Sequence, residues 1–136
     1  MHSAVLPFAE RIRQAGMRLA RRDIDTVQLN VGRLCNQACM HCHVNAGPKH
    51  TEIMDRRMAE LALELVRAAE AQIVDITGGA PELNPSSRSV VEQARHDGRH
   101  VMDRRSLTVL FEPGQEDLPE FLAKSNHGTL VQCGTR

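Results

Sequence analysis

The chain has 136 residues, of which 41% are hydrophobic, and its 17 basic side chains balance 17 acidic ones. This length suits one domain or part of one. No apolar run approaches the ~20 residues of a membrane span, and the charge balance favours neither nucleic acid nor an anionic membrane as a partner. The N-terminus has no signal-peptide core, so we expect a cytoplasmic protein with reduced thiols.

The first predicted element is a short helix over residues 6–15, inside an N-terminal helical segment, 1–25. Its apolar side chains recur at helical spacing and share one face: Phe8, Ile12 and Ala15. Gly16 follows as a stop signal. The arginines of this segment are expected to form a solvated face.

Residues 26–31 alternate apolar and polar side chains and predict the first strand. A long helix is expected from a cap at Thr51 to about Ala71. Its apolar residues recur at spacings of three and four and predict a buried stripe. The stripe consists of Met54, Met58, Leu61 and Leu65.

Residues 73–77 are short and mostly apolar, as expected of a buried parallel strand. Asn84 and Pro85 predict the start of a second helix, which Gly98 closes. The third strand is expected to begin over 100–103, with Arg104, Arg105 and Ser106 at or near its carboxyl end.

A further apolar run at 109–111 precedes a Pro113-Gly114 turn and a third helix capped by Asp117. Three apolar residues of that helix should face inward: Leu118, Phe121 and Leu122. Leu130 and Val131 could start a fourth strand, but we expect 129–136, which includes Cys133, to be an irregular or truncated tail.

The elements alternate as strand and helix through residues 26–128, which predicts parallel pairing with right-handed crossovers. Each unusual stretch follows a strand: the cysteines follow the first, Gly78-Gly79 the second, and Arg104 to Ser106 the third. In parallel α/β folds these carboxyl ends form one face, where sites are built. Asp75 and Asp103 lie inside strands and could be ion-pair partners rather than catalysts.

Three of the four cysteines lie within eight residues, as Cys35, Cys39 and Cys42, with the spacing C-x3-C-x2-C. Three thiolates in one loop can converge on a metal centre and leave a further position open, which is typical of a reactive centre. Two other interpretations stay open. The cysteines could be unconnected core thiols, or they could bind zinc with a nearby histidine as fourth ligand, namely His41, His43 or His50.

The cysteine motif and its surroundings resemble the radical S-adenosylmethionine (SAM) superfamily. In that superfamily three cysteines bind a [4Fe–4S] cluster, the amino and carboxylate groups of SAM chelate the fourth iron, and one electron cleaves SAM to methionine and a 5′-deoxyadenosyl radical. The resemblance implies an α/β fold, a partial parallel (β/α) barrel, of which this chain supplies about three βα units and a stub. It also implies an electron donor such as flavodoxin or ferredoxin.

The resemblance assigns SAM contacts as well. His41 stands where an aromatic residue usually packs near the adenine, and Gly78-Gly79 stands where a Gly-Gly-Glu stretch binds the SAM amino group. Arginine suits a bidentate carboxylate contact, so Arg104, Arg105 and Ser106 could bind the SAM carboxylate or ribose hydroxyls, or the two arginines could be a surface pair. The expected cofactor-binding residues are His41, Gly78, Gly79, Ala80, Pro81, Glu82, Arg104 and Ser106.

Longer stretches resemble the arsenosugar-biosynthesis type of radical SAM protein. They are residues 29–39, 41–44 and 75–85, continued at 100–104, 107–110 and 116–119. The resemblance implies transfer of a deoxyadenosyl group to a small substrate, a methylated arsenical. Proteins of that type are much longer, and Arg105-Ser106 stands where Cys-Asn is expected. The chain is therefore interpreted as an N-terminal fragment, with an inert fragment or partner subunit as the alternative to an active enzyme.

Overall fold

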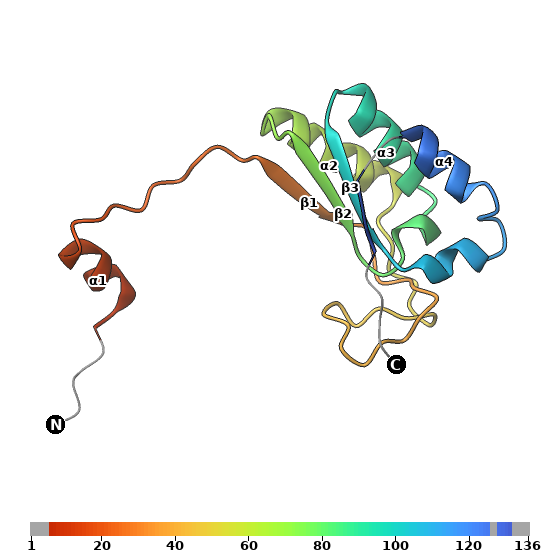
Figure 1. Cartoon of the computed structure of the whole chain (residues 1–136), viewed down its shortest axis with the longest axis horizontal. Coiled ribbons are helices and arrows are strands. Elements are labelled where there is room, and N and C mark those ends of the chain that lie inside the picture. The colour runs from red at the N-terminus through yellow and green to blue at the C-terminus, as the bar shows by residue number, and fades with distance from the viewer. Residues whose placement is uncertain (1–5, 126–127, 132–136) are drawn as a thin grey trace.

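The computed structural model describes residues 6–125 and 128–131 of the chain. It is an α/β structure built on an open parallel sheet with the strand order β1-β2-β3-β4 (Figure 1). The strands are β1 (Thr26–Asn30), β2 (Ile73–Thr77), β3 (His100–Arg105) and β4 (Gly128–Val131). Every neighbouring pair is parallel, with Gln28 beside Asp75 and Asp75 beside Met102. The predicted α/β class and the parallel pairing are confirmed.

The α-helices between consecutive strands lie together on one side of the sheet, whereas the helix that precedes β1 lies away from it (Figure 1). The α-helices are α1 (Phe8–Gln14), α2 (Arg56–Ala68), α3 (Ser87–His96) and α4 (Leu118–Ser125), with 3-10 helices η1 (Pro81–Leu83) and η2 (Leu107–Phe111). Among the described residues, no helix is long and apolar enough to cross a membrane.

The core lies between the sheet and helices α2 and α3. Val74, Ile76 and Val101 from the central strands are fully buried. They pack in one cluster with buried residues of the two helices: Ala59, Leu63, Val66, Val90, Val91 and Ala94. Since a buried Val or Leu side chain contributes roughly 1.5–3 kcal/mol, this aliphatic layer accounts for a fold with few aromatic residues.

Helix α2 differs from the prediction in both its start and its buried face. It begins after Asp55 rather than Thr51, because the Asp55 carboxylate accepts a hydrogen bond from the Met58 N–H at 2.7 Å. The predicted stripe was wrong for Met58, Leu61 and Leu65, which are 53%, 47% and 61% exposed, whereas its fourth member, Met54, is half-buried against the core. The adjacent stripe of Ala59, Leu63 and Val66 contacts the sheet instead.

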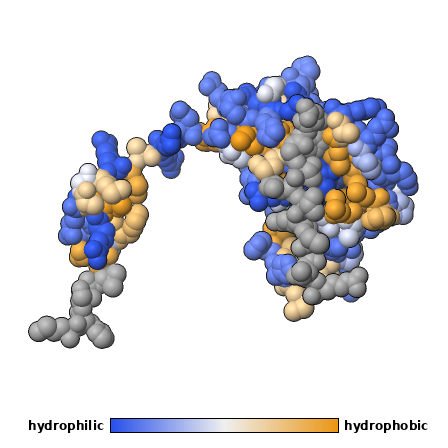
Figure 2. Space-filling view, viewed as in Figure 1, coloured by the Kyte–Doolittle hydropathy of each residue, from blue (hydrophilic) through white to orange (hydrophobic). Residues whose placement is uncertain are grey.

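The N-terminal segment contains the predicted short helix, which begins at Phe8 and ends at Gln14. It buries none of its residues, so its predicted apolar face contacts no core. Figure 2 shows apolar surface on this segment, where Phe8, Met17 and Leu19 are 69%, 58% and 66% exposed.

Other boundaries also differ from the prediction. Helix α3 begins at Ser87 rather than at Asn84, whose amide oxygen accepts from the Ser86 N–H at 2.8 Å while its NH₂ group donates to the Val31 and Met54 carbonyls. Strand β3 includes Arg104 and Arg105, and the apolar run at 109–111 belongs to η2. The predicted irregular tail from residue 129 is wrong up to Val131, since Gly128–Val131 pairs with β3. Residues 132–136, with Cys133, lie outside the described residues.

Candidate functional site

The cysteine loop, residues 32–53, leaves the carboxyl end of β1 and returns to the start of α2. Its two ends are joined by backbone hydrogen bonds, in which the Met54 N–H donates to the Val31 carbonyl at 2.9 Å and the Arg33 N–H to the Glu52 carbonyl at 2.8 Å. The buried Asn84 amide then donates to the carbonyls of both Val31 and Met54, at 2.8 and 2.9 Å. These contacts anchor the base of the loop to the segment that follows β2.

Inside the loop, the Arg33 guanidinium contacts the segment that follows the third cysteine. Its Nε donates to the Val44 carbonyl at 3.0 Å and its Nη2 to the Asn45 carbonyl at 3.2 Å. Its Nη1 pairs with Glu52 at 3.1 Å. Because one side chain joins three points of the loop, it fixes the segment next to Cys42.

Gly78 and Gly79 contact the cysteine loop itself. The Gly79 N–H donates to the Gly32 carbonyl at 2.9 Å, and the Ala80 N–H to the Leu34 carbonyl at 2.8 Å. A Cβ atom on Gly79 would lie 2.2 Å from the Leu34 oxygen, and one on Gly78 would lie 2.7 Å from the Gly32 oxygen. The close backbone approach that two glycines predict is therefore made by the chain's own loop.

The two residues after the first cysteine bind the η2 segment. The Asn36 amide donates to Glu112 at 2.8 Å and accepts from the Thr108 hydroxyl at 3.2 Å. The Gln37 amide oxygen accepts from the Ser106 hydroxyl at 3.3 Å and from the Cys39 thiol at 3.8 Å. Ser106 therefore positions the cysteine loop, a role that the sequence interpretation as a SAM contact did not include.

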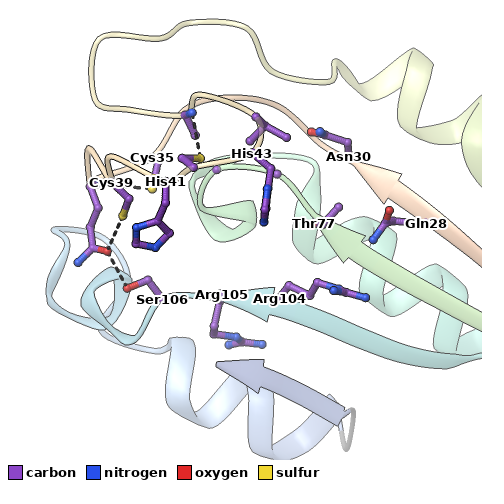
Figure 3. A pocket seen from close by; sticks show the side chains of 16 residues that line it. Gln28, Asn30, Cys35, Cys39, His41, His43, Thr77, Arg104, Arg105 and Ser106 are labelled. Atoms are coloured by element: carbon purple, nitrogen blue, oxygen red, sulfur yellow. Dashed lines mark hydrogen bonds between the residues drawn. The ribbon is translucent and has the colours of Figure 1, made fainter. Parts of the chain in front are cut away.

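These segments enclose one cavity of about 450 Å³ beside the carboxyl ends of β1, β2 and β3. Figure 3 shows the cysteines and histidines of the loop on one side of it and strand side chains on the other. Of the predicted site residues, those that line the cavity are Cys35, Cys39, Cys42, His41, Gly78, Gly79, Arg104 and Ser106. Cavity residues that the sequence interpretation did not assign to the site include Gln28, Asn30, Gln37 and Thr77, while His43 was considered only as a zinc ligand.

Three predicted cofactor-binding residues do not line the cavity: Ala80, Pro81 and Glu82 are buried beside it. The Glu82 carboxylate faces the buried Arg105 guanidinium at 3.0 Å, and Asp103 contacts the same guanidinium at 2.5 Å. One guanidinium cannot neutralise two carboxylates. Burial and the neighbouring Glu82 charge therefore raise the pKa of Asp103 to about 8.

The three thiols are free and differ in burial. Cys35 is buried, whereas Cys39 and Cys42 are half-buried. Backbone N–H groups donate to two of the sulfurs, from Gln37 to Cys35 at 3.4 Å and from Ala46 to Cys42 at 3.2 Å. Burial is the main cause that raises the pKa of the Cys35 thiol, and the nearby thiols add to it. Metal binding would have to displace this proton.

The donor set fits an iron–sulfur cluster in kind, because it offers three cysteine thiols on one cavity with N–H donors beside two of the sulfurs. Within residues 6–125 and 128–131, no three His, Cys, Asp or Glu side chains are grouped closely enough to hold a single metal ion. Binding an iron–sulfur cluster or a single metal ion would therefore require the three sulfur atoms to move closer together.

On the strand side, Asp75 has the ion-pair role expected of it, and its partner is Arg104. Arg104 donates from Nε at 2.8 Å and from Nη2 at 2.7 Å to the nearly buried Asp75 carboxylate. The Gln28 amide donates to the same carboxylate at 3.0 Å. Gln28 and Arg104 lie on the same face of the sheet as Asp75, because side chains alternate between faces along each strand. The polar residues on this face of β1 are the signal that could have identified Gln28 from the sequence.

Comparison with known proteins gives this chain no family. No model of a known protein family matches it, and no curated protein is similar enough to count as a relative.

Proposed function

We propose that this chain is a radical SAM protein that binds a [4Fe–4S] cluster through Cys35, Cys39 and Cys42 and holds SAM in the same cavity. The observation that carries the proposal is the position of the three thiols. They line one cavity at the carboxyl edge of a parallel sheet, together with Gly79 and Arg104 from the next two strand ends. The cavity is where α/β folds build their sites.

When bound, the cluster and SAM would supply one-electron reductive cleavage of the sulfonium C–S bond. The chain's own residues prepare the site for them. The N–H groups of Gln37 and Ala46 stabilise negative charge on two sulfurs, and Asn36 and Gln37 fix the loop to η2. His41 lines the cavity directly before Cys42 and is the side chain that we assign to the adenine.

The finer substrate assignment is part of the same proposal. Deoxyadenosyl transfer to a methylated arsenical, with an electron donor such as flavodoxin or ferredoxin, follows from the resemblance of residues 24–124. A partner subunit that binds the cluster without turnover is compatible with the same cysteine site. Cluster binding and SAM cleavage are therefore measured separately, so that a partner subunit that binds the cluster can be distinguished from an active enzyme.

A zinc-stabilised module is the second candidate, because two histidines line the cavity with the thiols. His41 and His43 both lie on the cysteine loop within the cavity wall. A structural zinc site takes four nitrogen or sulfur ligands at about 2.0–2.3 Å, which three thiols and one imidazole could supply.

The test is metal content after anaerobic reconstitution with iron and sulfide. Iron and acid-labile sulfide are measured in the wild type and in four variants, Cys35→Ala, Cys39→Ala, Cys42→Ala and Cys133→Ala. The proposal predicts that the first three variants lose most of the iron, while Cys133→Ala keeps it, because Cys133 is far from the motif in sequence. A wild type that takes up zinc but no iron and sulfide would support the zinc module instead.

A further inference from the structure

The end of the cavity beside the strands is lined by polar side chains that differ from the thiols at the other end. Figure 3 shows Gln28, Thr77 and Arg104 at one end of the cavity, while Cys39 and Ser106 lie at the other. The first three side chains come from β1, β2 and β3, on the rigid part of the fold. The thiols belong to the loop beyond the strands.

Arg104 is held in one orientation by the carboxylate beneath it. Asp75 accepts from Nε and Nη2, and its side chain is 4% exposed, whereas that of Arg104 is 32% exposed. Asp75 does not line the cavity, so the cavity surface presents the guanidinium and not its counter-charge. A guanidinium fixed in this way offers a planar edge that suits a carboxylate or phosphate.

The unused groups at this end are mostly donors. Among the described residues, the Arg104 Nη1 has no hydrogen-bond partner, and neither has the Thr77 hydroxyl. The Asn30 amide uses its oxygen to accept from the Gly32 N–H, which leaves its NH₂ group. None of the 16 described residues that line the cavity is Asp or Glu. A donor-rich surface without carboxylates favours an anionic ligand.

We propose that Arg104, backed by Asp75 and flanked by Gln28 and Thr77, is an oxyanion subsite that binds an anionic oxygen of the second substrate, for which inorganic phosphate and acetate are the probes. This inference rests on the proposed function, because it reserves the thiol end of the cavity for the cluster and for SAM. The sequence interpretation assigned Arg104 to the SAM carboxylate. Its place at the end away from Cys39 favours a group on another molecule instead.

The experiment titrates inorganic phosphate, and separately acetate, into the whole protein at constant ionic strength, with amide and arginine Nε–H NMR signals as the readout. Saturable shifts are expected at Gln28, Thr77 and Arg104. Arg104→Gln should weaken phosphate binding about tenfold or more, since hydrogen bonds to charged groups contribute that much. Thr77→Val should weaken it less and leave the Arg104–Asp75 pair intact.

Two further variants keep the result interpretable. Asp75→Asn combined with Arg104→Gln removes both charges, so that no buried carboxylate is left unpaired if Arg104→Gln alone fails to fold. Arg88→Gln is the matched control, because Arg88 forms a bidentate pair with Asp117 and is 35% exposed, but lies outside the cavity. Equal loss of phosphate binding in Arg88→Gln, or no loss in the Arg104 variants, would overturn the subsite.

A second experiment distinguishes the SAM carboxylate from an anionic group of the second substrate as the ligand of Arg104. Phosphate is titrated into reconstituted protein with and without saturating SAM. The inference predicts that phosphate affinity changes less than about twofold, because SAM and the anion occupy different ends of the cavity. Competition between SAM and phosphate would assign Arg104 to SAM and overturn the inference. Since the first titration needs neither cluster nor SAM, it gives its answer even if the protein binds no iron.

Discussion

Gly79→Ala should displace the cysteine loop, because Gly79 lies directly against it. The added Cβ would stand 2.2 Å from the Leu34 carbonyl oxygen, 2.7 Å from the Leu34 carbonyl carbon and 3.0 Å from the Cys35 Cβ. Two of these atoms belong to backbone, which cannot rotate away as a side chain can. The backbone of Gly79 itself is compatible with alanine, so the whole effect is steric.

The expected size follows from the contacts that must change. Relieving the overlap forces Leu34 away and breaks the hydrogen bond from the Ala80 N–H, now 2.8 Å long. Overpacking of this kind costs about 1–3 kcal/mol, and the hydrogen bond about 1 kcal/mol. We therefore expect the free energy of unfolding to fall by about 2–4 kcal/mol. Because Cys35 follows Leu34, reconstituted iron content should fall as well.

The assay combines urea unfolding followed by circular dichroism with iron content after reconstitution. Gly47→Ala is the matched control in the same loop, since its Cβ would meet only ordinary contacts at 3.7 and 3.9 Å. It should change the free energy of unfolding by less than about 1 kcal/mol. If Gly79→Ala unfolds and binds iron as the wild type does, the reasoning about the loop contact is refuted.

Three other predictions follow from the structure. The fold raises the pKa of Asp103 from 3.8 to about 8, so between these pH values the folded protein holds a proton that the unfolded chain has lost. The free energy of unfolding should therefore fall as pH rises from about 4 to about 8, and Asp103→Asn should flatten this decline in urea titrations. Leu63→Ala should lower the free energy of unfolding by about 2–5 kcal/mol, whereas exposed Leu61→Ala should change it by less than about 0.5 kcal/mol; equal losses would restore the sequence-predicted face of α2. Gln37→Ala should lower cluster retention in gel filtration, because it frees the loop from Ser106; unchanged retention would contradict the positioning role of Gln37.

The strands were predictable because their patterns allow one solution. Residues 73–77 are short and mostly apolar, which is typical of a buried parallel strand, and β2 is paired on both edges, by β1 and β3. For helix α2, the buried face could not be predicted from the sequence. The helix carries two apolar stripes one residue apart, and the one that faces the sheet is set by the Asp55 cap and by Asn84, which fixes the chain at Met54.

The candidate site was predictable in its cysteines and only partly in its other residues. C-x3-C-x2-C spacing identifies Cys35 and its partners without a structure. Glu82 was assigned to the cavity because it follows Gly-Gly in the sequence, but its carboxylate is drawn to buried Arg105. Asn36 and Gln37 are ordinary polar residues in sequence, and only the fold brings them to η2.

The most direct test of the central claim is electron paramagnetic resonance of the reconstituted protein, reduced with dithionite under anaerobic conditions, before and after addition of SAM. The proposal predicts the signal of a reduced [4Fe–4S] cluster, and a changed spectrum when SAM is added, because an iron not held by Cys35, Cys39 or Cys42 takes SAM as its ligand. The signal should be absent from Cys39→Ala. A protein without the signal, or with the same spectrum in the presence and absence of SAM, would contradict the account.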